Sequence, residues 1–241
     1  MQIIKLNATD STNNYLKQLL VDTALEDFCV VTTNHQIKGK GQMGAEWISE
    51  KGKNLTFSVL KKNPSVVLPQ QFLLSILVSL SIIKTLEYYN IPKLAIKWPN
   101  DILSDHCKIS GILIENLIKS NKIDFSVIGI GLNVNQTFFS DFKRKATSIG
   151  LEKENTSNLQ LTINNMLPFI AYQFDHLRVG RKNLDKNYLD NLYLSNLKRP
   201  YLFNGEKIEA VIKGVTPEGK LKLLSNSNRL ILADLKAIEF L

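Results

Sequence analysis

The segment 97–101, with the sequence Lys-Trp-Pro-Asn-Asp, restricts the local fold more than its surroundings do. Proline donates no backbone hydrogen bond and pushes the residue before it into an extended conformation, so neither a helix nor a central strand can continue through this segment. We therefore predict a turn at the end of an apolar strand over residues 94–96. That turn holds three polar side chains, of Lys97, Asn100 and Asp101, at one fixed place.

A second motif begins seven residues after Asp101 and reads Lys-Ile-Ser-Gly-Ile-Leu-Ile-Glu from Lys108 to Glu115. Its apolar residues predict a long strand with a lysine at its start. Lys108 supplies a fixed positive charge, and Gly111 has no side chain to keep a ligand away from the backbone. The two motifs together make this region the candidate functional site.

The chain has 241 residues, of which 44% are hydrophobic, enough for one full core and a small second unit. Its apolar stretches are interrupted well before the ~20 residues of a membrane span, and its start lacks the pattern of an export signal. The two cysteines, Cys29 and Cys107, are too few for a disulfide framework, so we expect a reduced, cytoplasmic protein without a membrane span. The net charge of +8 suits nucleic acid, an acidic protein, an anionic substrate or simply a solvated lysine-rich surface.

The apolar pattern predicts helices and strands in alternation before the central turn. Ser11 or Thr12 is predicted to cap the start of a short helix. Residues 28–33 are predicted to form a buried strand, and the alternation over residues 54–60 is typical of a half-buried one. The Leu-Pro pair at 68–69 opens the strongest predicted helix, which is apolar on one face and packs on the sheet.

After the central turn, residues 109–117 and 123–130 are predicted to form a β-hairpin. A glycine-rich bend over residues 129–135 ends its second strand. Two further helices are predicted at about 159–177 and 184–194. From Arg199 onward the period changes, and short strands separated by turn residues predict a small barrel of hairpins, at residues 201–203, 208–213, 221–224 and 230–233.

Taken singly, these signals leave function open. A glycine loop such as residues 39–44 is usually just a connection, and it lacks the glycine spacing of the phosphate-binding fingerprints. The three histidines, His35, His106 and His176, are scattered, and the cysteines are not at metal-ligand spacing. Cys107 beside Lys108 fits a lysine-activated thiol, although a buried, inert cysteine is the commoner case.

The order of the motifs is more specific. Ser-Thr-Asn at residues 11–13, the glycine loop within residues 36–47, the two motifs above and Gly-Ile-Gly-x-Asn-Val-Asn from Gly129 follow one another along the chain. In that order they closely resemble the biotin protein ligases. The resemblance implies an α+β fold, with a mixed or antiparallel sheet packed by helices as in the class II synthetase-like biotin and lipoate ligases, and a small C-terminal SH3-like β-barrel.

The same resemblance divides the chain into a catalytic domain at residues 1–195 and the SH3-like domain at residues 196–241. Because the sequence starts directly with the catalytic domain, it implies no helix-turn-helix, no DNA partner and no repressor activity. The acceptor protein implied by the family is the biotin carboxyl carrier domain of a carboxylase, and a homodimer is one of the oligomeric states the sequence allows.

The activity implied by the resemblance has two steps, with ATP, biotin and Mg²⁺. The biotin carboxylate first attacks the α-phosphate of ATP, and because two anions must meet, the site needs fixed positive charge and a divalent cation. Lys108 is the candidate for that charge. A lysine amine of the carrier then attacks the biotinyl-AMP, and since such an amine has a pKa near ~10.4, an anionic group must help it lose a proton. Asp101 matches that role, although an aspartate that caps a turn is the alternative.

Other family contacts fall on residues that match its motifs. Ser11, Thr12 and Asn13 match contacts to the ureido ring of biotin, and the aromatic rings of Trp47 and Trp98 match walls of the site or residues of the core. The resemblance assigns biotin contacts to Ser11, Thr12, Asn13, Gln36, Lys40, Gly41, Gln42, Lys108 and Gly111. It assigns nucleotide contacts to Lys40, Trp47, Lys97, Asn100 and Asn133, and no residue to the metal.

The glycine loop departs from the family pattern. The family commonly has Gly-Arg-Gly-Arg-Arg-Gly-Arg, whereas residues 39–45 read Gly-Lys-Gly-Gln-Met-Gly-Ala. Lys40 can meet an anion only as a point charge and lacks the bidentate geometry of arginine. We therefore expect a mobile loop that closes less tightly over the intermediate, or closes with help from Lys38.

Two other functions fit parts of the sequence. A lipoate- or octanoate-transferring enzyme of the same superfamily would bind a similar carboxylate on an aliphatic tail, although Lys-Trp-Pro-Asn-Asp argues against it. A non-catalytic module could use the basic surface and the terminal barrel to bind an acidic protein or RNA.

Overall fold

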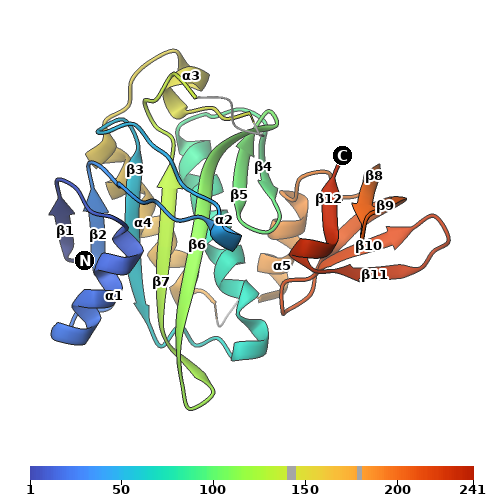
Figure 1. Cartoon of the computed structure of the whole chain (residues 1–241), viewed down its shortest axis with the longest axis horizontal. Helices are drawn as coiled ribbons and strands as arrows, with labels where there is room; N and C mark the ends of the chain where they lie inside the picture. The colour runs from blue at the N-terminus through green and yellow to red at the C-terminus, as the bar shows by residue number, and fades with distance from the viewer. Residues whose placement is uncertain (140–144, 178–180) are drawn as a thin grey trace.

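A seven-stranded mixed sheet forms the larger part of the protein in this computed structural model, which describes residues 1–139, 145–177 and 181–241 (Figure 1). Its strand order is β1-β2-β3-β7-β6-β5-β4, in which β1 and β2 pair in parallel and the other neighbours are antiparallel. The strands are β1 (Ile3–Leu6), β2 (Val30–Thr33), β3 (Leu55–Lys62), β4 (Leu94–Lys97), β5 (Asp101–Ser104), β6 (Cys107–Lys119) and β7 (Lys122–Leu132). The predicted α+β class is confirmed.

Helices cover both faces of this sheet. On one face Phe57 and Val59 of β3 pack in the main core with α2 (Phe72–Tyr88) and α4 (Leu159–Asp175). On the other face Leu60 packs with Leu16 of α1 (Thr12–Asp22). The prediction of a half-buried β3 is therefore wrong, because its alternating polar residues are covered as well: Ser58 has no exposed surface.

Helix α2 is buried on all sides over residues 72–83, apart from the half-buried Ser75, whereas the sequence predicted an apolar stripe on one face. Leu74, Val78 and Ile82, which lie off the predicted stripe, have no exposed surface. The helix follows the short turn η2 (Leu68–Gln70) and lies between the sheet and the helices α4 and α5 (Arg181–Asp190) (Figure 1). Among the described residues, the helical stretch Leu68–Tyr88 is long and apolar enough to cross a membrane, but 72% of its apolar window is buried inside the fold, as in a core helix.

The central turn is confirmed, and it is followed by a strand that the sequence did not reveal. Strand β4 ends at Lys97, the Trp98–Pro99 peptide bond is cis, and Asp101 begins β5. Residues 101–106, to which the sequence assigned no element, therefore hold β5 and a tight turn with positive φ at Asp105 and His106. As a consequence Asp101 and Lys108 come to lie on neighbouring strands.

The predicted hairpin is formed by β6 and β7, with Lys119 opposite Lys122 and positive φ at Ser120 and Asn121. The glycine-rich bend begins later than predicted, because β7 continues through two glycines to Leu132. The remaining short helices are η1 (Gln42–Gly44), α3 (Ile149–Lys153) and η3 (Leu235–Ala237).

Helix α4 agrees with its prediction, but α5 ends at Asp190, before the predicted residue 194. The chain after α5 is drawn into the two sheets instead: Leu192 forms a bridge with Ile96, and Ser195 forms one with Ile212. Leu194 has a positive φ, which is incompatible with a right-handed helix at this residue. The boundary predicted between residues 195 and 196 falls in this connection and stays a prediction.

The C-terminal unit is a five-stranded antiparallel sheet in the order β11-β10-β9-β8-β12, with β11 and β12 as its outer strands (Figure 1). The four predicted strands are confirmed, and the three-residue β12 was not foreseen. The strands are β8 (Lys198–Phe203), β9 (Glu206–Val215), β10 (Leu221–Ser225), β11 (Leu230–Ala233) and β12 (Ile238–Phe240).

The two sheets share one apolar core, and a glycine marks the contact between them. The indole Nε1 of Trp98 donates a hydrogen bond of 2.8 Å to the carbonyl oxygen of Gly219, in the turn between β9 and β10. A Cβ on Gly219 would lie 2.6 Å from the ring of Phe72 in α2. Gly219 therefore fits between the two aromatic residues only because it has no side chain.

We predict that Gly219→Ala destabilises the protein more than Gly205→Ala does. Both glycines have positive φ, but a Cβ on Gly205 would meet open space. Backbone strain alone should lower the free energy of unfolding by about 1 kcal/mol at Gly205. Overlap with Phe72 should raise the loss at Gly219 to about 2–4 kcal/mol. Urea unfolding of the two variants measures the difference, and equal losses would contradict the tight contact between the units.

Candidate active site

One cavity of about 1090 Å³ is lined by all the residues that the sequence nominated. Its walls come from the start of α1, the loop before β3, the β4–β5 turn, residues 111–113 of β6 and residues 129–131 of β7. Residues 235–240 of the second unit close one side. The predicted residues found in its lining are Ser11, Thr12, Asn13, Gln36, Lys40, Gly41, Gln42, Trp47, Lys97, Asn100, Asp101, Lys108, Gly111 and Asn133.

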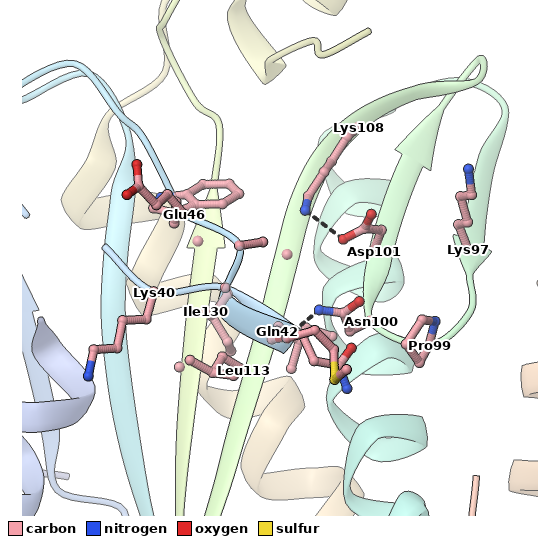
Figure 2. A pocket seen from close by; sticks show the side chains of 18 of the residues that line it. Lys40, Gln42, Glu46, Lys97, Pro99, Asn100, Asp101, Lys108, Leu113 and Ile130 are labelled. Carbon is pink, nitrogen blue, oxygen red and sulfur yellow. Dashed lines mark hydrogen bonds and ion pairs between the residues drawn. The ribbon is translucent and has the colours of Figure 1, made fainter. Parts of the chain in front are cut away.

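An ion pair occupies the middle of this cavity (Figure 2). The Nζ of Lys108 lies 2.6 Å from Oδ1 of Asp101, and the Asp101 side chain is only 5% exposed. Asp101 is opposite Gly111 in the β5–β6 ladder, where a Cβ would lie 3.1 Å from both Cε and Nζ of Lys108. The glycine therefore leaves the space through which Lys108 reaches Asp101.

Trp47 forms the neighbouring wall. Its ring centroid is 5.6 Å from the Nζ of Lys108, and a Cβ on Gly131 would lie 2.3 Å from the indole. Gly131 is thus placed within β7 to admit this ring, which explains why the strand carries glycines. The indole Nε1 of Trp47 is buried and has no hydrogen-bond partner among the described residues.

The glycine loop is braced by its own backbone in this structure. The amide of Gly41 donates to the carbonyl of Ala45 over 2.6 Å, and the amide of Trp47 donates to Gly39 over 3.0 Å. A Cβ on Gly39 would lie 2.1 Å from the carbonyl oxygen of Trp47. Lys38, which we expected to help the loop, pairs with Asp10 at 3.2 Å instead. Figure 2 shows the Lys40 side chain directed away from Lys108.

Two of the predicted nucleotide contacts use their side-chain amides to brace the backbone. The Nδ2 of Asn100 donates to the carbonyl of Ile112 over 2.8 Å, which fixes the β4–β5 turn to β6. The Nδ2 of Asn133 donates to the carbonyl of Thr147 over 3.0 Å. Both side chains thus hold the walls of the cavity in this structure.

The second unit contributes a wall that sequence reasoning missed. The Nζ of Lys97 lies 5.0 Å from the ring centroid of Phe240, and Lys236 and Glu239 also line the cavity. Lys236 lies in η3, and Glu239 and Phe240 lie in β12, far from the motifs in sequence. No local signal would have found them. Trp98, predicted as wall or core, is both: it lines the cavity and is 5% exposed.

A polar cluster lies behind the lining at Asn13. The Nδ2 of Asn13 donates to Oε2 of Glu115 over 2.8 Å, and the Nζ of Lys17 lies 2.7 Å from Oε1 of the same carboxylate. Sequence reasoning named Asn13 but gave Glu115 no role, although it ends the second motif. Burial raises the pKa of Glu115, but the hydrogen bonds from Lys17 and Asn13 outweigh that effect, so its pKa lies below the ordinary 4.5.

The residues around the cavity offer no ready-made metal site. No group of three or more His, Cys, Asp or Glu side chains stands together within the described ranges 1–139, 145–177 and 181–241. A hard divalent cation prefers several oxygen ligands, so a cation at this site would depend on oxygens from a ligand and from water.

Known proteins share this sequence pattern and fold. Residues 6–133 match the model of the biotin/lipoate A/B protein ligase family, which is more than half of the chain. The chain therefore belongs to the biotin/lipoate A/B protein ligase family.

Among named relatives, the chain is 31% identical over 150 residues to "Bifunctional ligase/repressor BirA" of Bacillus spizizenii, covering 61% of this chain and 46% of that protein. It is 32% identical over 131 residues to "Biotin--[acetyl-CoA-carboxylase] ligase" of Paracoccus denitrificans, covering 54% of this chain and 53% of that protein. The match thus spans about half the length of each relative.

Solved structures extend the likeness to the whole chain. The biotin protein ligase of Aquifex aeolicus in complex with biotin and ATP has a TM-score of 0.79 at 24% identity, covering 99% of this chain and 97% of that one. The Leishmania major biotin protein ligase in complex with biotinyl-5-AMP has a TM-score of 0.67 at 23% identity, covering 97% and 98%. At these identities the likeness shows that both units share the fold of these proteins.

We predict that the stabilising effect of the Glu115 carboxylate depends on pH. Because the folded-state pKa is lowered, the charged group stabilises the fold above its ordinary value of 4.5, and this contribution is lost as the pH falls through the lowered pKa. The gap in free energy of unfolding between wild type and Glu115→Gln should therefore be largest near neutral pH and shrink below about 4.5. Urea unfolding at several pH values measures the gap, and a constant gap would refute the effect.

Proposed function

We propose that this chain is an ATP-dependent biotin protein ligase, which activates biotin as biotinyl-5′-AMP and transfers it to a lysine of a carrier domain. The observation that carries the proposal is the ion pair of Lys108 and Asp101 in a cavity lined by every residue to which the resemblance assigns a contact. Membership of the family and the names of the relatives support it.

In the first step an oxygen of the biotin carboxylate attacks the α-phosphorus of ATP, and the bond from that phosphorus to the bridging oxygen breaks to release pyrophosphate. The reactants repel each other because both are anions. Lys108 offers a fixed positive charge that is partly shielded from water, where such a charge is worth more than in bulk water. When the two substrates bind, the Lys108 ammonium leaves Asp101 and binds the biotin carboxylate and the α-phosphate.

In the second step the carrier lysine attacks the carbonyl carbon of biotinyl-AMP, an amide forms, and AMP leaves with the electrons of the broken C–O bond. The ammonium must first lose one proton, to Asp101 or to water, so that the nitrogen lone pair can attack. The nitrogen loses a second proton to water as the amide forms. Asp101, no longer neutralised by Lys108, is an anion beside the reacting carbon that attracts the ammonium of the carrier lysine and orients it. One ion pair thus supplies the charge for each of the two steps in turn.

Two parts of the cavity lining differ in the way that the two substrates differ. The Ser11, Thr12, Asn13 and Gln36 part is polar and suits the ureido ring of biotin. The Trp47 part has an aromatic face, which suits an adenine ring. Mg²⁺ would be held by phosphate oxygens and water, and bound there it would offset phosphate charge.

The partner that this activity requires is a carrier domain with an exposed lysine. Electrostatics favour an acidic one, because the chain has a net charge of +8. The remaining expectations, of a cytoplasmic protein that acts as a monomer or homodimer without DNA, belong to the same proposal.

A lipoate or octanoate ligase is the alternative within the family, whose model covers both classes. Lipoate has no ureido group and would leave the buried polar groups of the Ser11 to Asn13 part without partners. A thermal-shift comparison separates the two. Stabilisation by biotin and not by lipoate supports the proposal, and the reverse result overturns it.

We predict that Lys108→Ala slows formation of biotinyl-AMP by about a hundredfold or more, because the charge that offsets the repulsion is lost. The assay follows pyrophosphate released from ATP in the presence of biotin and Mg²⁺. Lys93→Ala is the matched control, since Lys93 forms a 2.8 Å ion pair with Asp105 on the exposed surface. Equal rates in both variants would contradict the role of Lys108, and no biotin-dependent pyrophosphate from wild type would contradict the function.

A further inference from the structure

A chain of hydrogen bonds runs from the cavity lining into the protein interior. The Oγ1 of Thr12, in the lining, lies 2.7 Å from the hydroxyl of Ser58. That hydroxyl lies 2.6 Å from Oδ1 of Asn13, whose Nδ2 lies 2.8 Å from Glu115. Lys17 pairs with the other oxygen of Glu115 at 2.7 Å. Thr12, Ser58 and Asn13 are at most 3% exposed, so water competes little for these bonds.

The chemistry of each group fixes the direction of every proton in this chain. The Nδ2 of Asn13 faces the Glu115 carboxylate and the carbonyl of Leu113, which are acceptors only, so Oδ1 must be the end that faces Ser58. Ser58 has one proton and must donate it to that oxygen. In the remaining contact of Ser58, its oxygen must therefore accept the proton that the Thr12 hydroxyl donates.

Thr12 therefore has no proton to offer a ligand. Its other protein contact, 3.3 Å to Oε1 of Gln36, would also consume that proton, so the result does not depend on which of the two it donates to. The lone pairs of Oγ1 are what it presents to the cavity. Ser11 next to it is the opposite case, because its Oγ accepts from the amide of Asn14 and keeps its own proton to donate.

We propose that Glu115 is a positioning residue that sets the direction of this chain and so makes Thr12 an acceptor for a ligand N–H, beside Ser11 as a donor for a ligand carbonyl. The adjacent N–H and C=O of a cyclic urea match that pair. The inference rests on the proposed function and deepens it, because it derives the recognised edge of the ligand from proton positions. Glu115 does so from behind the lining, without touching the ligand.

Reversal of the chain is the distinguishing consequence. In Glu115→Gln, the side chain offers one acceptor and one donor, and the ammonium of Lys17 can use only the acceptor. The donor then faces the Nδ2 of Asn13. This clash is relieved when the Asn13 amide turns over, gives up its 3.3 Å hydrogen bond to the carbonyl of Leu113 and donates to Ser58, which then donates to Thr12. The hydroxyl of Thr12 can then donate only to the Gln36 oxygen, 3.3 Å away, or into the cavity. A proton that points into the cavity repels the N–H of the urea.

We therefore expect Glu115→Gln to weaken biotin binding about tenfold, the typical effect of a mismatched buried hydrogen bond. Lys17→Met should change the affinity less than about twofold, because the Glu115 carboxylate still accepts from Asn13. The double variant Lys17→Met/Glu115→Gln should recover most of the affinity, since without the ammonium the glutamine oxygen is available to Asn13. Isothermal titration with biotin measures all four proteins.

Recovery in the double variant supports the proposal, because a loss of charge or packing at Glu115 would not be repaired by removing a second charge. Equal affinity of wild type and Glu115→Gln overturns it. An equal loss in Glu115→Gln and in the double variant, including loss through misfolding, overturns it as well. Both results leave the proposed function standing if wild type binds biotin, whereas wild type that does not bind biotin contradicts the function itself.

Discussion

Asp101 and Lys108 lie on neighbouring strands, with Nζ and Oδ1 2.6 Å apart, and the Asp101 side chain is only 5% exposed. A buried carboxylate is costly unless a cation accompanies it, and this requirement shapes the surrounding structure. The central turn brings β5 beside β6, Gly111 leaves the path for the Lys108 side chain, and Gly131 admits the Trp47 ring that stacks near its ammonium. Both glycines thus occupy strand positions where a side chain would displace the charged pair or its wall.

Two parts of the cavity lining have different physical character, and each depends on a part of the fold distant in sequence. Behind the polar part, α1 and β6 meet through the contact of Asn13 and Lys17 with Glu115. One side is closed by the C-terminal unit, which is fixed to the central turn by Trp98 and Gly219. The second unit therefore completes the wall of the site and shares its core, so it is part of the same structure in physical terms.

Sequence reasoning succeeded where local chemistry decides the structure. The proline turn, the serine cap, the β6–β7 hairpin and the motif residues of the cavity all follow from short stretches of sequence. It failed where contacts between residues distant in sequence determine the structure. The strands β5 and β12 are too short to give a pattern, and α5 ends because the following residues form bridges to both sheets. The burial of β3 depends on the helices that cover its two faces. Ser58 and Glu115 were missed as parts of the site because their role arises only when α1 packs on the sheet.

The proposed reaction requires the Lys108 ammonium to leave Asp101 and bind the two substrate anions. A crystal structure with biotin and a non-hydrolysable ATP analogue tests this most directly. The account predicts that the Nζ of Lys108 leaves Asp101 and lies within hydrogen-bond distance of both the biotin carboxylate and the α-phosphate, with the ureido ring at Thr12. Ligands bound in this cavity with Lys108 still paired to Asp101 and in contact with neither anion would contradict it.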